Sequence, residues 1–213
     1  MTEKEFDEYM ATDGKNLTWN NYFQEVDKKT GKEYRGQWTK DRENWQGLGE
    51  LKFCDGSRYQ GMVKNKTFNG PGRMTHANGD LYQGQWKDGK AHGKGTFVDS
   101  TGSIYDGDWV NDKQHGQGTE SWNDGKIRYQ GDFVDGKKTG HGTFVFDGSR
   151  YEGDFVDGKF HGHGKYYFAD SGKIYEGGFV DNTMSGNGVM VWPDGSRYEG
   201  EFKNGMMNGR GIK

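Results

Sequence analysis

Apolar positions along the chain recur in short alternating segments. A tyrosine is followed four residues later by a bulky apolar residue, with a glycine midway between them, as in Tyr82-Gln-Gly-Gln-Trp86. Alternate residues of a β-strand point to the same face, so the tyrosine, the glycine and the second ring share one face. The segment therefore predicts a strand with one apolar face, on which the glycine makes room between two rings.

This segment occurs eight times, at spacings of 22 to 25 residues. A turn such as Lys87-Asp-Gly-Lys90 follows each copy, then a Gly-x-Gly pair, a second apolar run and another turn such as Asp194-Gly-Ser196. Each unit predicts a β-hairpin, and the units predict an all-β, elongated, twisted, single-layer antiparallel meander. The expected aromatic ladder comprises Tyr34, Trp38, Tyr59, Tyr82, Trp86, Tyr105, Trp109, Tyr129, Phe133, Tyr151, Phe155, Tyr175, Phe179, Tyr198 and Phe202.

The pattern Tyr-x-Gly-x-Trp/Phe followed by Gly-x-Gly resembles the MORN (membrane occupation and recognition nexus) repeat family. The resemblance covers eight repeats over residues 34–213. Departures are Val63 in place of a ring and a glycine pair, Gly47 and Gly49, displaced by two residues in the first repeat. The resemblance implies a ribbon of antiparallel hairpins, and chains made almost entirely of such repeats resemble axonemal and radial-spoke proteins.

The two ends differ from the repeats. Residues 17–33 are expected to form a partial repeat with a closing strand over 19–26 and a turn. Residues 1–16 carry a net charge of −3, and they predict either a short amphipathic helix over about residues 2–12 or an acidic tail. The eighth repeat is expected to lack most of its closing strand before Lys213, which predicts strand addition by a second copy or another protein.

Composition supports an ordered but unusual chain. Glycine contributes 38 of 213 residues, and a mean hydropathy of −1.15 alone would favour disorder. The aromatic share of 15% argues against disorder. Outside residues 1–16, 27 basic and 27 acidic residues balance, so no strong field for nucleic acid or anionic lipid is expected. The single cysteine, Cys54, excludes an intramolecular disulfide, and neither a signal peptide nor a membrane span is expected.

Candidate chemistry is sparse. Three histidines precede the first glycine of a pair and two lie between the glycines, so repeat descent explains their positions, and a row of side chains about 10 Å apart does not build a metal site. Each Gly-x-Gly leads into a strand, whereas a phosphate loop leads into a helix. The sequence therefore predicts no catalytic residues, cofactor or metal. The histidines are His92, His115 and His161, and His141 and His163.

Two rows of charge remain. Lys90, Lys113, Lys137 and Lys159 recur at the hairpin turns beside aspartates, which favours solvated turns over contacts with lipid headgroups. The second row lies opposite the rings and becomes acidic along the chain. It predicts either a solubilising face with cross-strand ion pairs or a surface for a basic partner. The candidate partner residues are Asp106, Asp108, Asp132, Glu152, Asp154, Glu176, Glu199 and Glu201.

The pattern favours a non-catalytic scaffold that spaces or joins proteins. The family resemblance implies a cytoskeletal assembly in the cytoplasm, above all a ciliary or flagellar axoneme. The alternative, also implied by the resemblance, is a peripheral membrane module that binds phosphoinositides and tethers membranes. Other proteins are the expected partners, without nucleic acid.

Overall fold

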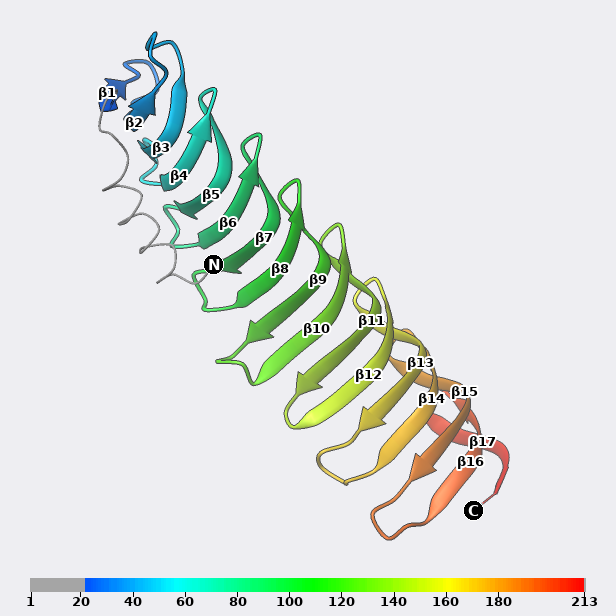
Figure 1. The fold of residues 1–213 in the computed structure, drawn as a ribbon. Helices are drawn as coiled ribbons and strands as arrows, with labels where there is room; N and C mark the ends of the chain where they lie inside the picture. The colour runs from blue at the N-terminus through cyan, green and yellow to red at the C-terminus, as the bar shows by residue number, and fades with distance from the viewer. Residues whose placement is uncertain (1–21, 213) are drawn as a thin grey trace. The chain divides into compact units, whose positions relative to one another are not determined.

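Every regular element in the described part of the chain is a β-strand. The computed structural model describes residues 22–212, which hold seventeen strands and no helix (Figure 1). The chain divides into two compact units, one up to Lys113 and one from Gln114. Within each unit, successive strands pair antiparallel in chain order, so the predicted all-β single-layer meander is confirmed. The helix or tail expected over residues 1–16 lies outside the described residues.

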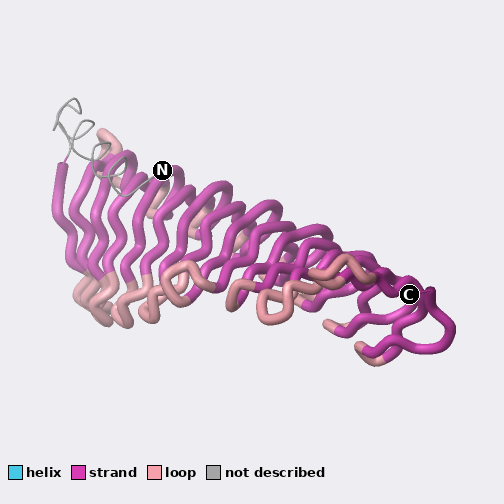
Figure 2. Tube along the Cα trace, turned by 90° about the horizontal axis from the view of Figure 1, so that it is seen from below, coloured by secondary structure: helices cyan, strands magenta, loops and turns pink. Residues whose placement is uncertain are grey.

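Strands of 5 to 10 residues alternate with short turns at their ends (Figure 2). The first unit contains β1 (Tyr22–Val26), β2 (Glu33–Trp38), β3 (Trp45–Lys52), β4 (Arg58–Lys64), β5 (Thr67–Thr75), β6 (Leu81–Lys87), β7 (Lys90–Val98) and β8 (Ile104–Val110). The second contains β9 (Lys113–Trp122), β10 (Ile127–Val134), β11 (Lys137–Phe146), β12 (Ser149–Val156), β13 (Lys159–Tyr167), β14 (Ile174–Val180), β15 (Thr183–Val191), β16 (Arg197–Lys203) and β17 (Met206–Ile212).

Closing strands begin earlier than the sequence suggests. Pairing starts at the residue after the turn, as at Lys87 with Lys90, so the Gly-x-Gly pair lies inside the strand and not before it. For the same reason the eighth repeat has a closing strand of seven residues, β17, which forms five residue pairs with β16. The prediction that this strand is mostly missing is wrong, and strand addition there stays a prediction.

The tight turns explain the recurrent Asx-Gly pairs. In the turn between β12 and β13, Asp157 and Gly158 have φ values of 48° and 80°. Two successive residues with positive φ define the type I′ hairpin turn, whose twist matches that of the flanking strands. Asparagine, aspartate and glycine adopt this conformation at the lowest cost.

A bulge follows the central glycine of nearly every opening strand. In β12 the register with β13 shifts between Gly153 and Asp154. Gly153 lies opposite Gly164, and the Tyr151 ring covers both: a Cβ at Gly153 would lie 2.5 Å from the Gly164 Cα and 2.6 Å from the Tyr151 hydroxyl oxygen. The bulge brings the carbonyl of Asp154 to 2.9 Å from that hydroxyl, which donates to it.

Rings of successive repeats interlock on the face that carries the tyrosines, here called the ring face. The Tyr151 ring contacts Phe155 of its own strand and Phe179 of the next repeat edge to face, with distances between ring centroids of 5.2 Å and 5.0 Å. Phe160 stacks on the same ring, with its centroid 3.9 Å away. Edge-to-face and offset pairs add to the stabilisation that burial provides. The ring face is the core of the fold, and rings such as Tyr151 join two repeats.

Candidate functional site

Residues of the ring face form the core and stabilise the fold. All the aromatic-ladder residues are buried except Trp38, which is half-buried. Every repeat tyrosine donates its hydroxyl to the carbonyl three residues ahead, at 2.7 to 3.0 Å. Burial raises the pKa of Tyr59, Tyr82, Tyr129, Tyr151 and Tyr175, to about 12 for Tyr175, so these phenols stay protonated as donors. Functional side chains are therefore sought on the opposite face, here called the polar face.

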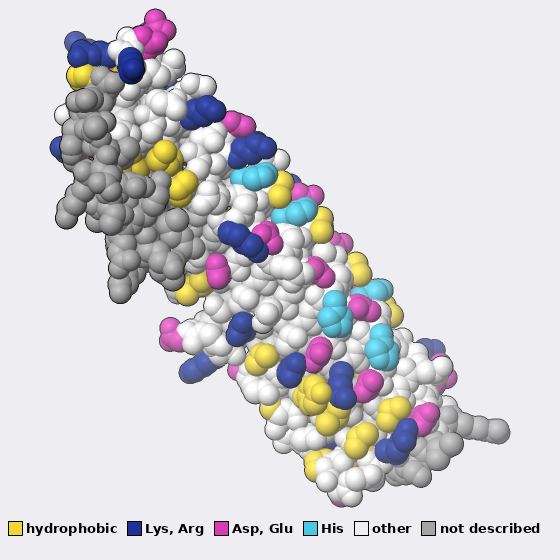
Figure 3. Space-filling view, in the orientation of Figure 1, with side chains coloured by type: hydrophobic (Ala, Val, Ile, Leu, Met, Phe, Trp, Pro, Cys, Tyr) yellow, Lys and Arg dark blue, Asp and Glu magenta, His cyan; other side chains and the backbone are white. Residues whose placement is uncertain are grey.

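The polar face presents aligned rows of side chains from successive strands. In the second unit, Lys165 of β13 lies opposite Glu176 of β14, which lies opposite Val189 of β15, and Val189 lies opposite Glu199 of β16. Basic, acidic and apolar side chains are mixed on the face in view in Figure 3, without a broad patch of one charge. All eight candidate partner residues belong to such rows, one or three residues after a repeat tyrosine.

Several of these carboxylates are paired with bases of the same face. Lys165 Nζ lies 3.1 Å from Glu176, Lys94 Nζ 2.8 Å from Asp108, and Arg150 Nη2 2.6 Å from Glu152; Arg197 pairs closely with Glu199. The Glu176 carboxylate raises the pKa of Lys165 by hydrogen bonding and charge. Asp106 accepts a hydrogen bond from Thr96, and Glu201 accepts one from Asn208. Much of the acidic charge is thus offset within the sheet.

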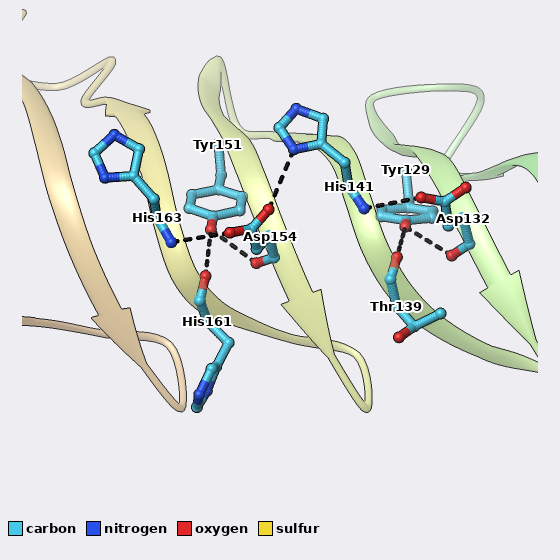
Figure 4. A network of polar contacts seen from close by, with 8 residues as sticks. All are labelled: Tyr129, Asp132, Thr139, His141, Tyr151, Asp154, His161 and His163. Atoms are coloured by element: carbon cyan, nitrogen blue, oxygen red, sulfur yellow. Dashed lines mark hydrogen bonds and ion pairs between the residues drawn. The ribbon is translucent and has the colours of Figure 1, made fainter.

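Two of the candidate residues cap the backbone. Asp132 Oδ2 accepts the N–H of His141 at 2.9 Å, and Asp154 Oδ2 accepts that of His163 at 3.1 Å (Figure 4). Both donors lie between the two glycines of a pair, and the acceptor is the third residue after the tyrosine, here called the capping position. Asp132 and Asp154 therefore have a structural role that the sequence analysis missed.

Other repeats support this reading of the capping position. In the first repeat the amide oxygen of Gln37 accepts the N–H of Leu48 at 2.8 Å. In the second, the residue between the glycines is Pro71, which has no N–H, and the capping position holds Met62, which has no strong acceptor. The acceptor is absent where the donor is absent.

The histidines do not converge. His141 Nδ1 lies 3.4 Å from Asp154 Oδ1, while the carbonyl of His161 accepts a bond from Tyr151 at 3.3 Å (Figure 4). Across residues 22–212, no group of three or more His, Cys, Asp or Glu side chains is arranged to hold a metal ion. Over the same residues, no helix is long and apolar enough to cross a membrane.

Lysines of the turns form bridges between repeats. Lys137 Nζ lies 2.8 Å from Asp157 in the next turn, and Lys159 Nζ lies 3.2 Å from Asp181 in the turn after it. The Asp157 carboxylate raises the pKa of Lys137, and Lys137 in turn lowers the pKa of Asp157, mainly through their hydrogen bond. These pairs are exposed, so each contributes little to stability.

One part of the polar face is hollowed. A groove of about 810 Å³ lies over β13 to β16, and its floor includes Ile174, Val189 and Val191. Gly178, which follows the lining residue Gly177 and lies opposite the lining residue His163, has no side chain at the capping position. Superimposing the eight repeats on their tyrosines would have revealed this from the sequence, because Gly178 is the one glycine at that position.

Comparison with known proteins agrees with the repeat analysis. The MORN repeat profile matches residues 34–58, 59–81, 82–104, 105–127, 129–149, 151–173, 175–197 and 198–213. The chain therefore belongs to the MORN-repeat family. No curated protein matches the chain significantly.

Solved structures show only a loose likeness. The TCP domain of SAS-4 (dCPAP) from Drosophila melanogaster, solved in complex with a proline-rich motif of Ana2, is 15% identical with a TM-score of 0.44, over 75% of this chain and 87% of that one. The TCP10 domain of CPAP from Danio rerio is 10% identical with a TM-score of 0.47, over 84% of this chain and 83% of that one. TM-scores this low give these likenesses no weight in assigning function.

Proposed function

We propose that this protein is a non-catalytic scaffold whose polar face binds other proteins. The proposal rests on the different roles of the two faces of the sheet. The rings hold the fold from one side, and the other side presents aligned rows of charged and apolar side chains on a rigid sheet. Side chains held by a regular sheet lose little further freedom on binding, which favours recognition of a partner.

The proposed assembly is cytoskeletal, and a cilium or flagellum is the first place to look. Family membership supports this, because chains built almost wholly of such repeats resemble axonemal components. Imaging of the tagged chain in ciliated cells tests the location. A signal confined to the cytosol, and absent from detergent-resistant cytoskeletal fractions, would contradict it.

Charge reversal tests the polar face directly. Glu176→Lys with Glu199→Lys changes the face without touching the capping carboxylates, while Glu43→Lys with Asp170→Lys makes the same change in two exposed loops, at residues without positive φ. We expect the melting temperature to be nearly unchanged in both proteins, since exposed charges contribute little. Crosslinked partners recovered from native cells should fall severalfold for the first protein and remain for the control. Equal recovery from both would reject the polar face as the binding surface.

A second candidate function rests on a cluster of lysines in the first unit. Lys28, Lys29, Lys32 and Lys66 line a pocket of about 550 Å³ beside Trp45, and they outnumber the two carboxylates of its lining, Glu25 and Asp27. Burial lowers the pKa of Lys32. Such a cluster suits an anionic headgroup, which is the membrane alternative. Co-sedimentation with phosphoinositide vesicles at physiological salt, lost in Lys32→Gln with Lys66→Gln, would favour that alternative. Sedimentation no greater than with phosphatidylcholine vesicles would reject it.

A further inference from the structure

The seventh repeat combines an apolar residue before its tyrosine, an apolar residue in its closing strand and a glycine at the capping position, a combination found in no other repeat. One residue before the tyrosine it has Ile174; two other repeats have Leu81 and Ile104 there, and four have arginine: Arg58, Arg128, Arg150 and Arg197. In the closing strand it has Val189, where Thr96, Thr119 and Thr143 occupy the equivalent place. At the capping position it has Gly178. Ile174 and Val189 line the groove over β13 to β16, and Gly178 follows the lining residue Gly177.

The floor of the groove is apolar although it lies on the polar face. Ile174 and Val189 are half-buried, and Val191, opposite Ile174, is 36% exposed. An apolar partner side chain placed here would remove this surface from water, which is the main favourable contribution to association.

The backbone at the border of the groove offers a hydrogen-bond donor to a partner. The N–H of Asn187 lies between two glycines, as the N–H of His163 does, but Gly178 provides no side chain to cap it. A Cβ at Gly178 would collide with the Ser185 carbonyl oxygen, so no larger residue fits there without a shift of the backbone. A carbonyl oxygen of a bound segment can take the place of the missing cap.

Charge at the two ends of the groove indicates the partner's sign. Lys165 and Arg197 are already paired with Glu176 and Glu199. Asp154 accepts the N–H of the lining residue His163 and contacts His141. Glu201 follows the lining residue Gly200 and accepts a hydrogen bond from Asn208, so both carboxylates border the groove. A lysine or arginine of the partner would find a carboxylate at either end.

We propose that this groove binds a segment of another protein in which an apolar side chain lies next to a lysine or arginine. This proposal rests on the scaffold function proposed above and names the chemistry of its partner. The apolar side chain contacts Ile174 and Val189, a partner carbonyl accepts from Asn187, and the basic group pairs with Asp154 or Glu201.

The test uses the full chain and three labelled synthetic peptides with alternating Leu and Lys, Leu and Glu, or Ser and Lys. We expect the Leu–Lys peptide to bind most tightly, with an affinity that falls as salt rises. Ile174→Arg with Val189→Thr replaces the floor by residues the chain uses in other repeats, and should weaken that binding about tenfold. Val145→Thr, the same kind of change outside the groove, is the matched control.

Amide chemical shifts locate the peptide independently of affinity. The Leu–Lys peptide should shift the Asn187 amide resonance and leave unchanged that of Leu48, which Gln37 caps in the first repeat. Equal binding of the Leu–Lys and Leu–Glu peptides, an unchanged affinity of the double variant, or shifts spread evenly over the sheet would overturn the proposal. If these results appear while Glu176→Lys with Glu199→Lys still loses native partners, the groove fails but the scaffold function stands.

Discussion

At the scale of single residues, the repeat tyrosine performs three tasks. Its ring covers a cross-strand glycine pair, its edge contacts rings of two repeats, and its hydroxyl bonds a carbonyl at the bulge. Only the second task is visible in the sequence. The first requires the register of the closing strand, and the third requires the bulge, which neither composition nor alternation predicts.

Removing the hydroxyl of one repeat tyrosine should show how much its hydrogen bond contributes to stability. Tyr151→Phe keeps the ring but leaves the carbonyls of Asp154 and His161 without this donor. We expect a loss of about 1–3 kcal/mol in the free energy of unfolding, because a buried acceptor loses its partner. Urea denaturation measures it. Tyr166→Phe is the control, since its hydroxyl has no hydrogen bond within the described residues. A loss below about 0.5 kcal/mol for Tyr151→Phe would show that the bond contributes little.

The same phenols predict sensitivity to alkali. Burial raises the pKa of Tyr175 from 10.0 to about 12, and it also raises the pKa values of Tyr59, Tyr82, Tyr129 and Tyr151. The folded protein therefore holds these protons when the unfolded chain has released them. The stabilisation is complete below pH 10.0 and should decline as the pH rises from 10.0 toward about 12. Urea midpoints that stay constant over this range would contradict the buried phenols.

At the scale of elements, the alternation of apolar and polar residues predicts the hairpins but not the side chains that cap their backbone. Tyr82, Gly84 and Trp86 predict the ring face of β6 because a strand repeats every two residues. The capping role of Asp154 could not be predicted in this way, since its donor, His163, lies on the next strand across a register shift. From the sequence, Asp154 is predicted to be a partner residue only because its side chain is acidic.

A matched pair of variants on β12 separates a cap from an ion pair. Asp154→Ala removes the acceptor of the His163 N–H and should cost about 1–2 kcal/mol. Glu152→Ala removes only an exposed pair with Arg150 and should cost less than about 0.5 kcal/mol. Chemical denaturation of both proteins makes the comparison. Equal losses would mean that the capping bond adds nothing beyond surface charge.

At the scale of the whole molecule, the repeat is the unit of construction. Contacts described for one repeat involve its own strands and the adjacent repeats, as in a chain of nearest neighbours. Stability of such proteins is approximately a sum over repeats and their interfaces.

Deleting one complete unit should therefore be tolerated. Removal of residues 151–174 joins Arg150 to Tyr175 and keeps every ring on the same face. We expect a folded β-protein with a smaller denaturant m-value, since less surface is exposed on unfolding. Removal of residues 149–158 alone deletes the opening strand β12 with its turn and leaves β13, and it should abolish cooperative unfolding. Loss of structure in both deletions would show that repeats are not interchangeable.

The backbone caps also constrain how the repeats evolve. Pro71 has no N–H, and its capping position holds Met62; His141 and His163 have an N–H, and theirs hold aspartate. Two positions nine residues apart in these repeats are thus linked by one hydrogen bond. Across many repeats of the family, proline between the glycines should co-occur with residues that cannot accept, and carboxylates or amides with the other residues. Mutational drift at one position is then expected to be followed by compensation at the other, so each repeat carries a correlated pair and not two independent sites.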